Sequence, residues 1–291
     1  MKLGFFRYEG RGIRLGDQPP RYERIDWDVY NTSTLENKVR DALTALAVAR
    51  RQAGVDSTRI LLMGTSEGTL LAAEAASRAP GQVAGLVLYA VMADNMRDVF
   101  RFIITEGAFL PYRRAFDTDS NGQVSRAEFE ADPRRYRERV LRNAPFEALD
   151  RSGDSVLSVE DITLLTARLG DALTNSDYAS LDQWAKTSAA VSTPANWFKD
   201  HFAHPTIWTF LSRLHIPVGL FHGDADVNTS VAGVRRLEEQ ARAAGKTKMR
   251  FAYFPNADHS LNLGLYFARG ELPPGHQAIF AFLEEQVRVR R

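Results

Sequence analysis

The sequence contains no cysteine. Disulfide bonds, thiolate metal ligands and a cysteine nucleophile are therefore excluded. It also has no apolar stretch long enough to cross a membrane, and residues 1–15 lack the apolar segment of a signal peptide. We therefore expect no membrane span, and the sequence leaves the cellular compartment unknown.

Neither sign of charge dominates the composition. The 37 Lys and Arg residues nearly balance the 36 Asp and Glu residues, which gives a formal net charge of +1. This balance argues against nucleic acid as the main partner. Hydrophobic residues make up 44% of the 291 residues, enough to bury a substantial core.

A glycine-rich turn around a serine is the most informative stretch of the chain. The apolar residues 60–63 lead into Gly64-Thr65-Ser66-Glu67-Gly68, and the small-residue segment 69–76 follows. Strand, sharp turn and helix form the context in which G-x-S-x-G presents a nucleophile. We therefore predict that Ser66 is a nucleophile and that the amide of Glu67 donates to an oxyanion. The alternative is an ordinary turn around a surface serine.

Apolar patterning predicts strands and helices that alternate on both sides of a long helical stretch. A helix is expected to begin at a capping box formed by Ser33 and Glu36 and to end at Gly54. The expected strands cover residues 1–8, 60–63, 83–91, 216–221 and 249–254, and later helices cover 231–244 and 275–288.

The alternation indicates an α/β fold with a mostly parallel sheet flanked by helices. Residues 95–213 interrupt it, because they are mostly helical and charged and contain no convincing strand. We therefore predict a core formed by residues 1–94 and 214–291, with residues 95–213 as an insertion.

A serine becomes a good nucleophile only when a base accepts its proton and an acid holds that base in one tautomer. His259 follows the predicted strand 249–254, and Asp226 follows the strand 216–221. Their separation of 33 residues fits one crossover helix plus one strand. Asp224 is a rival acid, and we interpret Asp258 as a turn residue.

The other histidines carry weaker signals. His222 ends a predicted strand and is interpreted as a packed structural residue. His201 and His204 form an H-x-x-H pair that could bind a metal, but no third ligand lies near in the sequence. We therefore favour a surface position for this pair.

The order Ser66, Asp226, His259 resembles the α/β-hydrolase superfamily of serine hydrolases. The segment 6–12, Phe-Arg-Tyr-Glu-Gly-Arg-Gly, is similar to the R-Y-D-x-R-G segment of dipeptidyl-peptidase-like and acyl esterases. The resemblance covers roughly residues 1–94 and 214–291. It implies that Asp226, the second aspartate of H-G-x-x-D, is the acid and that residues 1–8 form the fourth strand of the family's sheet.

The chain departs from that family at its beginning. The family has three strands upstream, and the loop after the third supplies a second oxyanion donor. This chain has no residues for that strand, so the sheet is expected to be short at its N-terminal side. Either the chain start is truncated or the core is rearranged, and only Glu67 is assigned as an oxyanion donor. An exposed first strand could also pair with a second copy to form a homodimer.

The insertion contains a sequence that matches a calcium-binding EF-hand loop at every diagnostic position. It begins at Asp117, and glycine at position 6 provides the sharp turn. Val124 is expected to pair with an equivalent residue in a partner loop. The predicted ligands are Asp117, Asp119, Asn121, Gln123 through its carbonyl, Ser125 and Glu128.

A second loop begins 33 residues later. Ser155 replaces the turn glycine, so a non-glycine residue must adopt an unfavourable angle. Asp161 replaces the final glutamate and reaches an ion less easily, so we expect a weaker site that tolerates magnesium better. Leu157 is expected to pair with the first loop. The predicted ligands are Asp150, Ser152, Asp154, Val156 through its carbonyl, Ser158 and Asp161.

These patterns predict a serine hydrolase that cleaves small carboxylic esters through an acyl-enzyme, with a calcium-binding EF-hand pair in a helical cap over the active site. One alternative is a serine peptidase or amidase of the same fold. Another is a non-catalytic, calcium-responsive binding protein on a hydrolase shell. The sequence does not specify the acyl group, the natural substrate or the oligomeric state.

Overall fold

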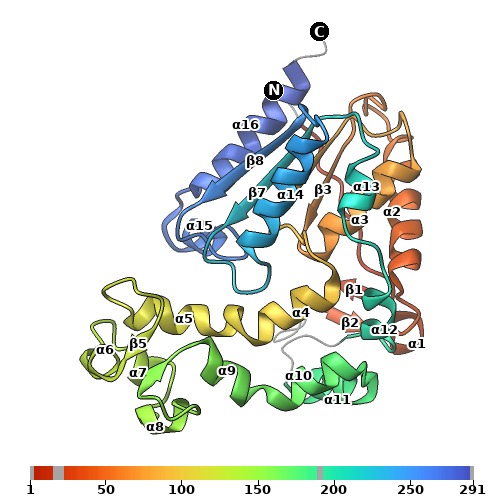
Figure 1. The fold of residues 1–291 in the computed structure, drawn as a ribbon. Coiled ribbons are helices and arrows are strands. Elements are labelled where there is room, and N and C mark those ends of the chain that lie inside the picture. The colour runs from red at the N-terminus through yellow and green to blue at the C-terminus, as the bar shows by residue number, and fades with distance from the viewer. Residues whose placement is uncertain (1–2, 16–22, 189–192, 289–291) are drawn as a thin grey trace.

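The computed structural model describes residues 3–15, 23–188 and 193–288. Its centre is a parallel sheet of four strands in the order β3, β4, β7, β8 (Figure 1). The α/β fold with a parallel sheet, as the sequence predicted, is confirmed. The strands are β3 (Leu61–Thr65), β4 (Gly85–Tyr89), β7 (Val218–Gly223) and β8 (Met249–Phe254).

The middle strands β4 and β7 are buried on both faces, where successive side chains point into two different apolar layers. Leu86 and Leu88 of β4 lie in one apolar layer with α2, α3, α13 and α14, whereas Val87 lies in a second layer with α16. The helices are α2 (Leu35–Ala49), α3 (Glu67–Arg78), α13 (Trp208–Leu211), α14 (Val231–Ala243) and α16 (Pro274–Arg288).

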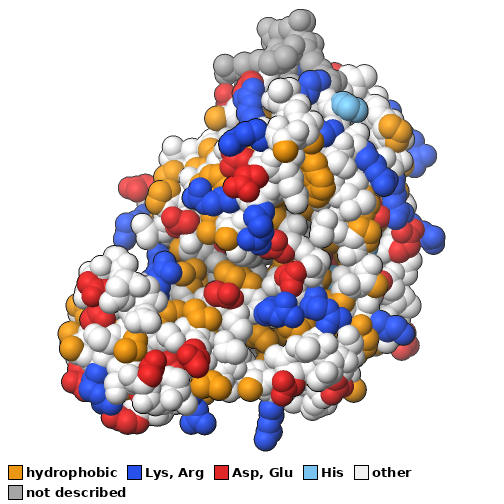
Figure 2. All heavy atoms as spheres, viewed as in Figure 1, with side chains coloured by type: hydrophobic (Ala, Val, Ile, Leu, Met, Phe, Trp, Pro, Cys, Tyr) orange, Lys and Arg blue, Asp and Glu red, His pale blue; other side chains and the backbone are white. Residues whose placement is uncertain are grey.

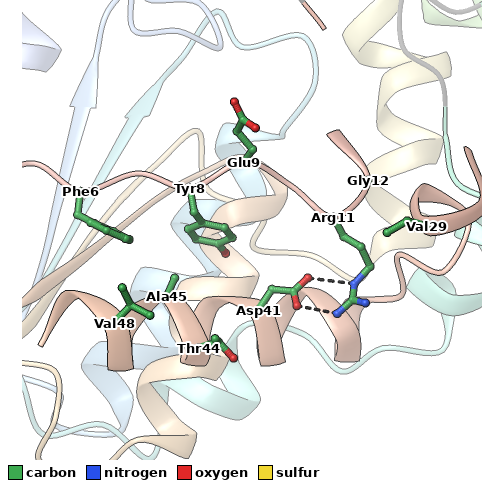
Figure 3. Close-up of a pocket in the computed structure, with 10 residues that line it drawn as sticks. All are labelled: Phe6, Tyr8, Glu9, Arg11, Gly12, Val29, Asp41, Thr44, Ala45 and Val48. Atoms are coloured by element: carbon green, nitrogen blue, oxygen red, sulfur yellow. Dashed lines mark hydrogen bonds and ion pairs between the residues drawn. The ribbon is translucent and has the colours of Figure 1, made fainter. Parts of the chain in front are cut away.

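The prediction of a strand over residues 1–8 is wrong for residues 3–8, which the structure describes and which form no strand. Residues 1 and 2 lie outside the described residues. A strand needs a neighbour, and among the described residues β3 pairs only with β4. The segment instead lies along α2, where Phe6 and Tyr8 help to line an open pocket of about 440 Å³ (Figure 3). Arg11 fixes it there through two hydrogen bonds to Asp41, of 3.0 and 2.6 Å.

A short antiparallel hairpin follows this segment. It consists of β1 (Ile13–Leu15) and β2 (Glu23–Ile25) and leads into the four-residue helix α1 (Trp27–Tyr30). The hairpin is separate from the central sheet. Among the described residues β3 is therefore an edge strand of the central sheet, and its Met63 is 43% exposed.

Helix α2 forms as predicted, but its ends differ. Thr34, not Ser33, caps it, because the Thr34 side chain accepts a hydrogen bond from Asn37 N at 3.1 Å. Glu36 instead binds Arg40 and Arg78. The helix ends at Ala49, before Gly54.

The residues between β4 and α13 form a largely helical insertion, which lies beyond the carboxyl ends of the strands (Figure 1). Thr105 separates its first two helices, α4 and α5. The helices are α4 (Met96–Ile104), α5 (Glu106–Phe116), α6 (Arg126–Ala131), α7 (Tyr136–Arg139), α8 (Phe146–Leu149), α9 (Val159–Leu165), α10 (Ala167–Asn175), α11 (Tyr178–Ser188) and α12 (Trp197–Phe202).

The insertion also contains two very short strands, β5 (Val124–Ser125) and β6 (Val156–Leu157), although no strand was predicted there. They pair antiparallel, with Val124 opposite Leu157. The predicted pairing of these two residues is therefore confirmed. A local apolar cluster that includes Phe116, Phe129 and both paired residues holds this part of the insertion together.

The distribution of charge over the surface agrees with the composition. Figure 2 shows acidic and basic side chains interspersed over the visible face, as expected for a chain without a dominant charge. None of the described helices combines the length and apolar character that crossing a bilayer requires.

Candidate active site

The turn after β3 holds Ser66 in a strained backbone conformation. Its φ of 54° and ψ of −127° place a non-glycine residue in a sparsely populated region, at the start of α3. The hydroxyl does not cap that helix, and Ser66 N donates to Tyr89 O at 3.2 Å. A serine hydroxyl is thereby presented between a strand end and a helix N-terminus, as the motif predicted.

The two glycines of the motif have different roles. A Cβ at Gly64 would lie 2.2 Å from Gly68 O, so the strand and the helix approach too closely for any side chain. A Cβ at Gly68 would meet nothing within 4 Å. Only Gly64 is therefore needed for the close approach of β3 and α3.

Strand register brings the predicted acid and base to the same edge as Ser66. Thr65 lies opposite Tyr89, and Tyr89 lies opposite Phe221 of β7. Because all four strands are parallel, the residues that follow β3, β7 and β8 leave the sheet at one edge. Ser66, Asp226 and His259 follow these three strands.

The structure joins Asp226 and His259 directly. His259 Nδ1 lies 2.9 and 2.8 Å from the two carboxylate oxygens of Asp226. Asp226 is only 2% exposed, and it also accepts hydrogen bonds from Asn228 N, Thr229 N and Thr229 Oγ1, of 2.8, 3.0 and 2.6 Å. Burial raises the pKa of Asp226, but the hydrogen bonds and the nearby imidazole outweigh it, so the pKa is lowered.

This pairing has a chemical consequence for the imidazole. An ionised carboxylate only accepts hydrogen bonds, so Nδ1 of His259 carries the hydrogen and Nε2 can accept a proton. The His259 side chain is 27% exposed, whereas the Asp226 side chain is fully buried. The base can therefore meet a substrate while its orienting acid is shielded from water.

The rival acids are engaged elsewhere. Asp224 accepts a hydrogen bond from Asn256 N at 2.6 Å. Asp258 accepts from Ser260 N and Asn262 N, each at 2.8 Å, as expected for a turn residue. The structure therefore selects Asp226 as the partner of His259.

No hydrogen bond joins Ser66 Oγ to His259 Nε2 in the part of the chain that is described, and neither atom has another partner there. The structure thus assembles the acid–base pair and places the serine at the same sheet edge. The completed three-residue relay remains a prediction.

His222 is a packed structural residue, as predicted. It is fully buried, its Nδ1 accepts from Val91 N and its Nε2 donates to Thr229 O, each at 3.1 Å. Burial lowers the pKa of His222, which favours the neutral ring that these bonds require. It ties the loop of Asp226 to the end of β4.

The surface position predicted for His201 and His204 is wrong. His201 is fully buried, and the His204 side chain is 14% exposed. His201 Nε2 lies 3.1 Å from Glu67 Oε1, and His204 Nε2 lies 2.8 Å from Glu74 Oε2. Because each ring has its own glutamate on α3, the pair does not form a shared metal site.

Glu67 has a second partner, Lys38 of α2, whose Nζ lies 2.6 Å from the same carboxylate oxygen as His201. Burial raises the pKa of Glu67, but the hydrogen bond from His201 and the charge of Lys38 lower it to about 2. These contacts were not predicted. The spacing could have indicated them. Glu67 and Glu74 lie seven residues apart on one face of a helix, and the two histidines lie three residues apart, so two parallel His–Glu contacts are possible.

The first predicted calcium loop is folded around its acidic residues. Asp117, Asp119 and Glu128 offer carboxylate oxygens within 4.8 Å of one another. Ser120 and Gly122, at positions 4 and 6, have φ values of 62° and 87°. The remaining predicted ligands lie in the same loop: Asn121 accepts from Gln123 N, and Ser125 N and Oγ donate to Glu128.

The second loop repeats the positive φ angles of the first loop. Gly153 and Ser155, at the same two positions, have φ values of 75° and 69°, so the unfavourable angle predicted for Ser155 is confirmed. Asp161 is 1% exposed and accepts from Arg151 N at 2.8 Å. The other ligand candidates bond locally: Ser152 to Asp150 and Asp161, Val156 N to Asp154, and Ser158 N to Asp161.

No protein-family model matches the chain, and no curated protein matches it either. Similar solved structures include Est1E from Butyrivibrio proteoclasticus, at 15% identity, 88% coverage of this chain, 71% of that chain and a TM-score of 0.40. The α/β hydrolase GrgF from Penicillium sp. sh18 is 13% identical, with 95% of this chain and 77% of that chain covered and a TM-score of 0.44. Dipeptidyl peptidase 4 from Porphyromonas gingivalis is 13% identical, with 89% of this chain and 25% of that chain covered and a TM-score of 0.41. Because these TM-scores are low, the site is assigned from its own geometry.

The two motif glycines provide a matched test of the turn. We expect Gly64→Ala to lower the free energy of unfolding by roughly 2–4 kcal/mol, because its Cβ would collide with backbone. Gly68→Ala should change it by less than about 1 kcal/mol, since the site is open and alanine favours a helix. Urea unfolding measures both, and equal effects would contradict this account of the turn.

Acid should weaken the fold through Glu67. Its folded pKa of about 2 lies below the ordinary value of 4.5, so its stabilisation is present above pH 4.5 and is lost as the pH falls toward 2. Between pH 7 and pH 3 this loss amounts to about 2 kcal/mol. Between pH 7 and pH 3, the free energy of unfolding of Glu67→Gln should therefore fall by about 2 kcal/mol less than that of the wild type. Equal losses in urea titrations at the two pH values would contradict the expectation.

Proposed function

We propose that this chain is a serine hydrolase that cleaves carboxylic esters through an acyl-enzyme intermediate. The observation that carries the proposal is the buried carboxylate of Asp226, hydrogen-bonded to Nδ1 of His259. This pair lies at the sheet edge where strained Ser66 immediately precedes α3. A buried acid that orients a partly exposed imidazole, at the same sheet edge as a serine, is the arrangement on which acyl transfer depends.

In the proposed reaction, Ser66 Oγ attacks the acyl carbonyl and His259 Nε2 accepts its proton. Asp226 keeps the imidazole in the required tautomer and stabilises the cation. The proton then passes to the departing alcohol, which leaves an acyl-enzyme. Water attacks this ester with His259 again as base, and the acid product is released.

Esters are favoured over amides because only one oxyanion donor is assigned, the amide of Glu67. Loss of one donor costs about 10²–10³ in rate in enzymes that use two. An alkoxide is a better leaving group than an amide nitrogen, so ester cleavage tolerates this loss more easily. A peptidase or amidase of the same fold would need a second donor.

We further propose that the insertion binds calcium through two EF-hand loops and that the ion does no chemistry. The proposal is supported by the repeated positive φ angles in both loops, the pairing of Val124 with Leu157 and the three clustered carboxylates of the first loop. Oxygen ligands of this kind suit Ca²⁺. The shorter Asp161 makes the second loop the weaker site, with better tolerance of magnesium.

Helix α5 offers a route by which calcium would affect the active site. It ends at Phe116, one residue before the first loop. Near its start, Gly107 packs so closely on the loop of Asp226 that an added Cβ would lie 2.3 Å from Val227 O. Ordering of the first loop would therefore stabilise a helix that contacts the acid loop.

A non-catalytic, calcium-responsive binding protein is the second candidate function. The observation that favours it is the missing hydrogen bond between Ser66 and His259 among the described residues. Catalytic hydrogen bonds are often long in structures without substrate, so the hydrolase remains the better proposal. Hydrolysis assays separate the two.

Ester hydrolysis tests the proposed roles. With a p-nitrophenyl acyl ester, Ser66→Ala and His259→Ala should abolish turnover, and Asp226→Asn should lower kcat on the order of 10⁴-fold because it disturbs the tautomer. Asp224→Asn is the matched control and should keep its activity. Turnover of aminoacyl amides rather than esters would instead support the peptidase, and no turnover of either by calcium-loaded protein would support the binding protein.

Calcium titration tests the insertion. Calorimetry should show a tighter site that Glu128→Gln removes and a weaker site that Asp161→Asn removes, because the glutamate binds an ion through both oxygens. EGTA should lower both the melting temperature and the esterase activity. A tighter second site would contradict the ranking, and unchanged melting and activity in EGTA would contradict the coupling through α5.

A further inference from the structure

The end of the insertion is fastened to the helix that carries the candidate nucleophile. Two histidines, His201 in α12 and His204 just after it, each meet a glutamate of α3. Glu67 begins α3, and Glu74 lies two turns further along. One contact therefore lies beside Ser66 and the other lies away from it.

The contact at Glu67 joins three elements that are far apart in the sequence. Its carboxylate is held by Lys38 from α2 at 2.6 Å and by His201 from α12 at 3.1 Å. Asp200 strengthens the junction, because its carboxylate accepts from Leu35 N, the first residue of α2, at 2.7 Å. Glu67 is thus the point where α2, α3 and the insertion meet.

His201 is itself held rigidly. The ring is fully buried and stacks on Trp197, with 4.0 Å between ring centroids and an interplanar angle of 25°. Its Nδ1 lies 2.9 Å from Trp197 O, so both ring nitrogens face oxygen acceptors. A ring fixed on both sides restrains the side chain that it binds.

We propose that Glu67 is a positioning residue, whose clamp by Lys38 and His201 fixes the backbone amide that receives the oxyanion charge. The inference rests on the proposed function, since it assigns a role within that reaction. The side chain and the amide belong to the same residue, next to Ser66. Clamping the side chain therefore limits rotation of the turn that presents both groups, and the insertion becomes part of the active-site support.

Glu74 supplies a matched control on the same helix. It is 3% exposed and binds His204 and Arg78. Its pair with His204 joins the same two parts of the chain as the pair of Glu67 with His201. A role in stability alone would therefore give Glu67→Gln and Glu74→Gln similar consequences.

The experiment compares steady-state hydrolysis of a p-nitrophenyl ester by the full chain. We expect Glu67→Gln to lower kcat about tenfold with KM changed less than twofold, because misplacement of a donor slows the chemical step. Glu74→Gln should keep the wild-type kcat. His201→Leu should behave like Glu67→Gln, and His201→Gln should restore most of the loss because its amide can donate to Glu67.

Each result decides a different question. Equal kcat for Glu67→Gln and Glu74→Gln, or failure of His201→Gln to exceed His201→Leu, would overturn the positioning role while the proposed function stands. A wild type that hydrolyses no ester would overturn the proposed function and this inference together. If Glu67→Gln does not fold by circular dichroism, the two His201 variants decide alone.

Discussion

The parallel register of four strands is the constraint on which the candidate site depends. Thr65, Tyr89 and Phe221 lie side by side across β3, β4 and β7, and β8 continues the sheet. A chain that leaves these strands must therefore turn at one common edge. This is why Ser66, Asp226 and His259, which are distant in the sequence, reach the same side of the molecule.

The register alone does not orient the side chains. Asp226 is held by backbone and hydroxyl donors of its own loop, and His222 ties that loop to the end of β4. Ser66 is held by strained backbone and by the close approach that Gly64 permits. Each group thus depends on local contacts that would be lost if its turn were rebuilt.

The insertion is connected to this edge at both ends. Its start contacts the acid loop through Gly107 of α5, and its end contacts α3 through His201 and His204. Between these contacts lie the two acidic loops. A change in the loops therefore has a physical route to the acid and to the nucleophile.

The sequence predicted those elements whose pattern is local. Strand β8 matches the expected residues 249–254, and the helix and strand around Ser66 follow from alternating runs of apolar and small residues. The pairing of Val124 with Leu157 follows from equal positions in two similar loops. Such features depend on neighbours in the sequence or on a repeat.

Features that depend on distant partners were not predictable. Residues 3–8 have strand-like composition, but whether they form a strand depends on a neighbouring strand. The burial of His201 depends on Glu67 and Lys38, more than 100 residues away. The choice of Asp226 over Asp224 came from a family pattern, and the hydrogen bonds of His259 supply its physical reason.

The most direct measurement is the site of covalent attack by a fluorophosphonate, mapped by mass spectrometry of the digested protein. The account predicts one adduct, on the peptide that contains Ser66, and its absence from Ser66→Ala and His259→Ala. An adduct that persists in Ser66→Ala, or no adduct on the folded wild type, would contradict the claim that this sheet edge activates a serine.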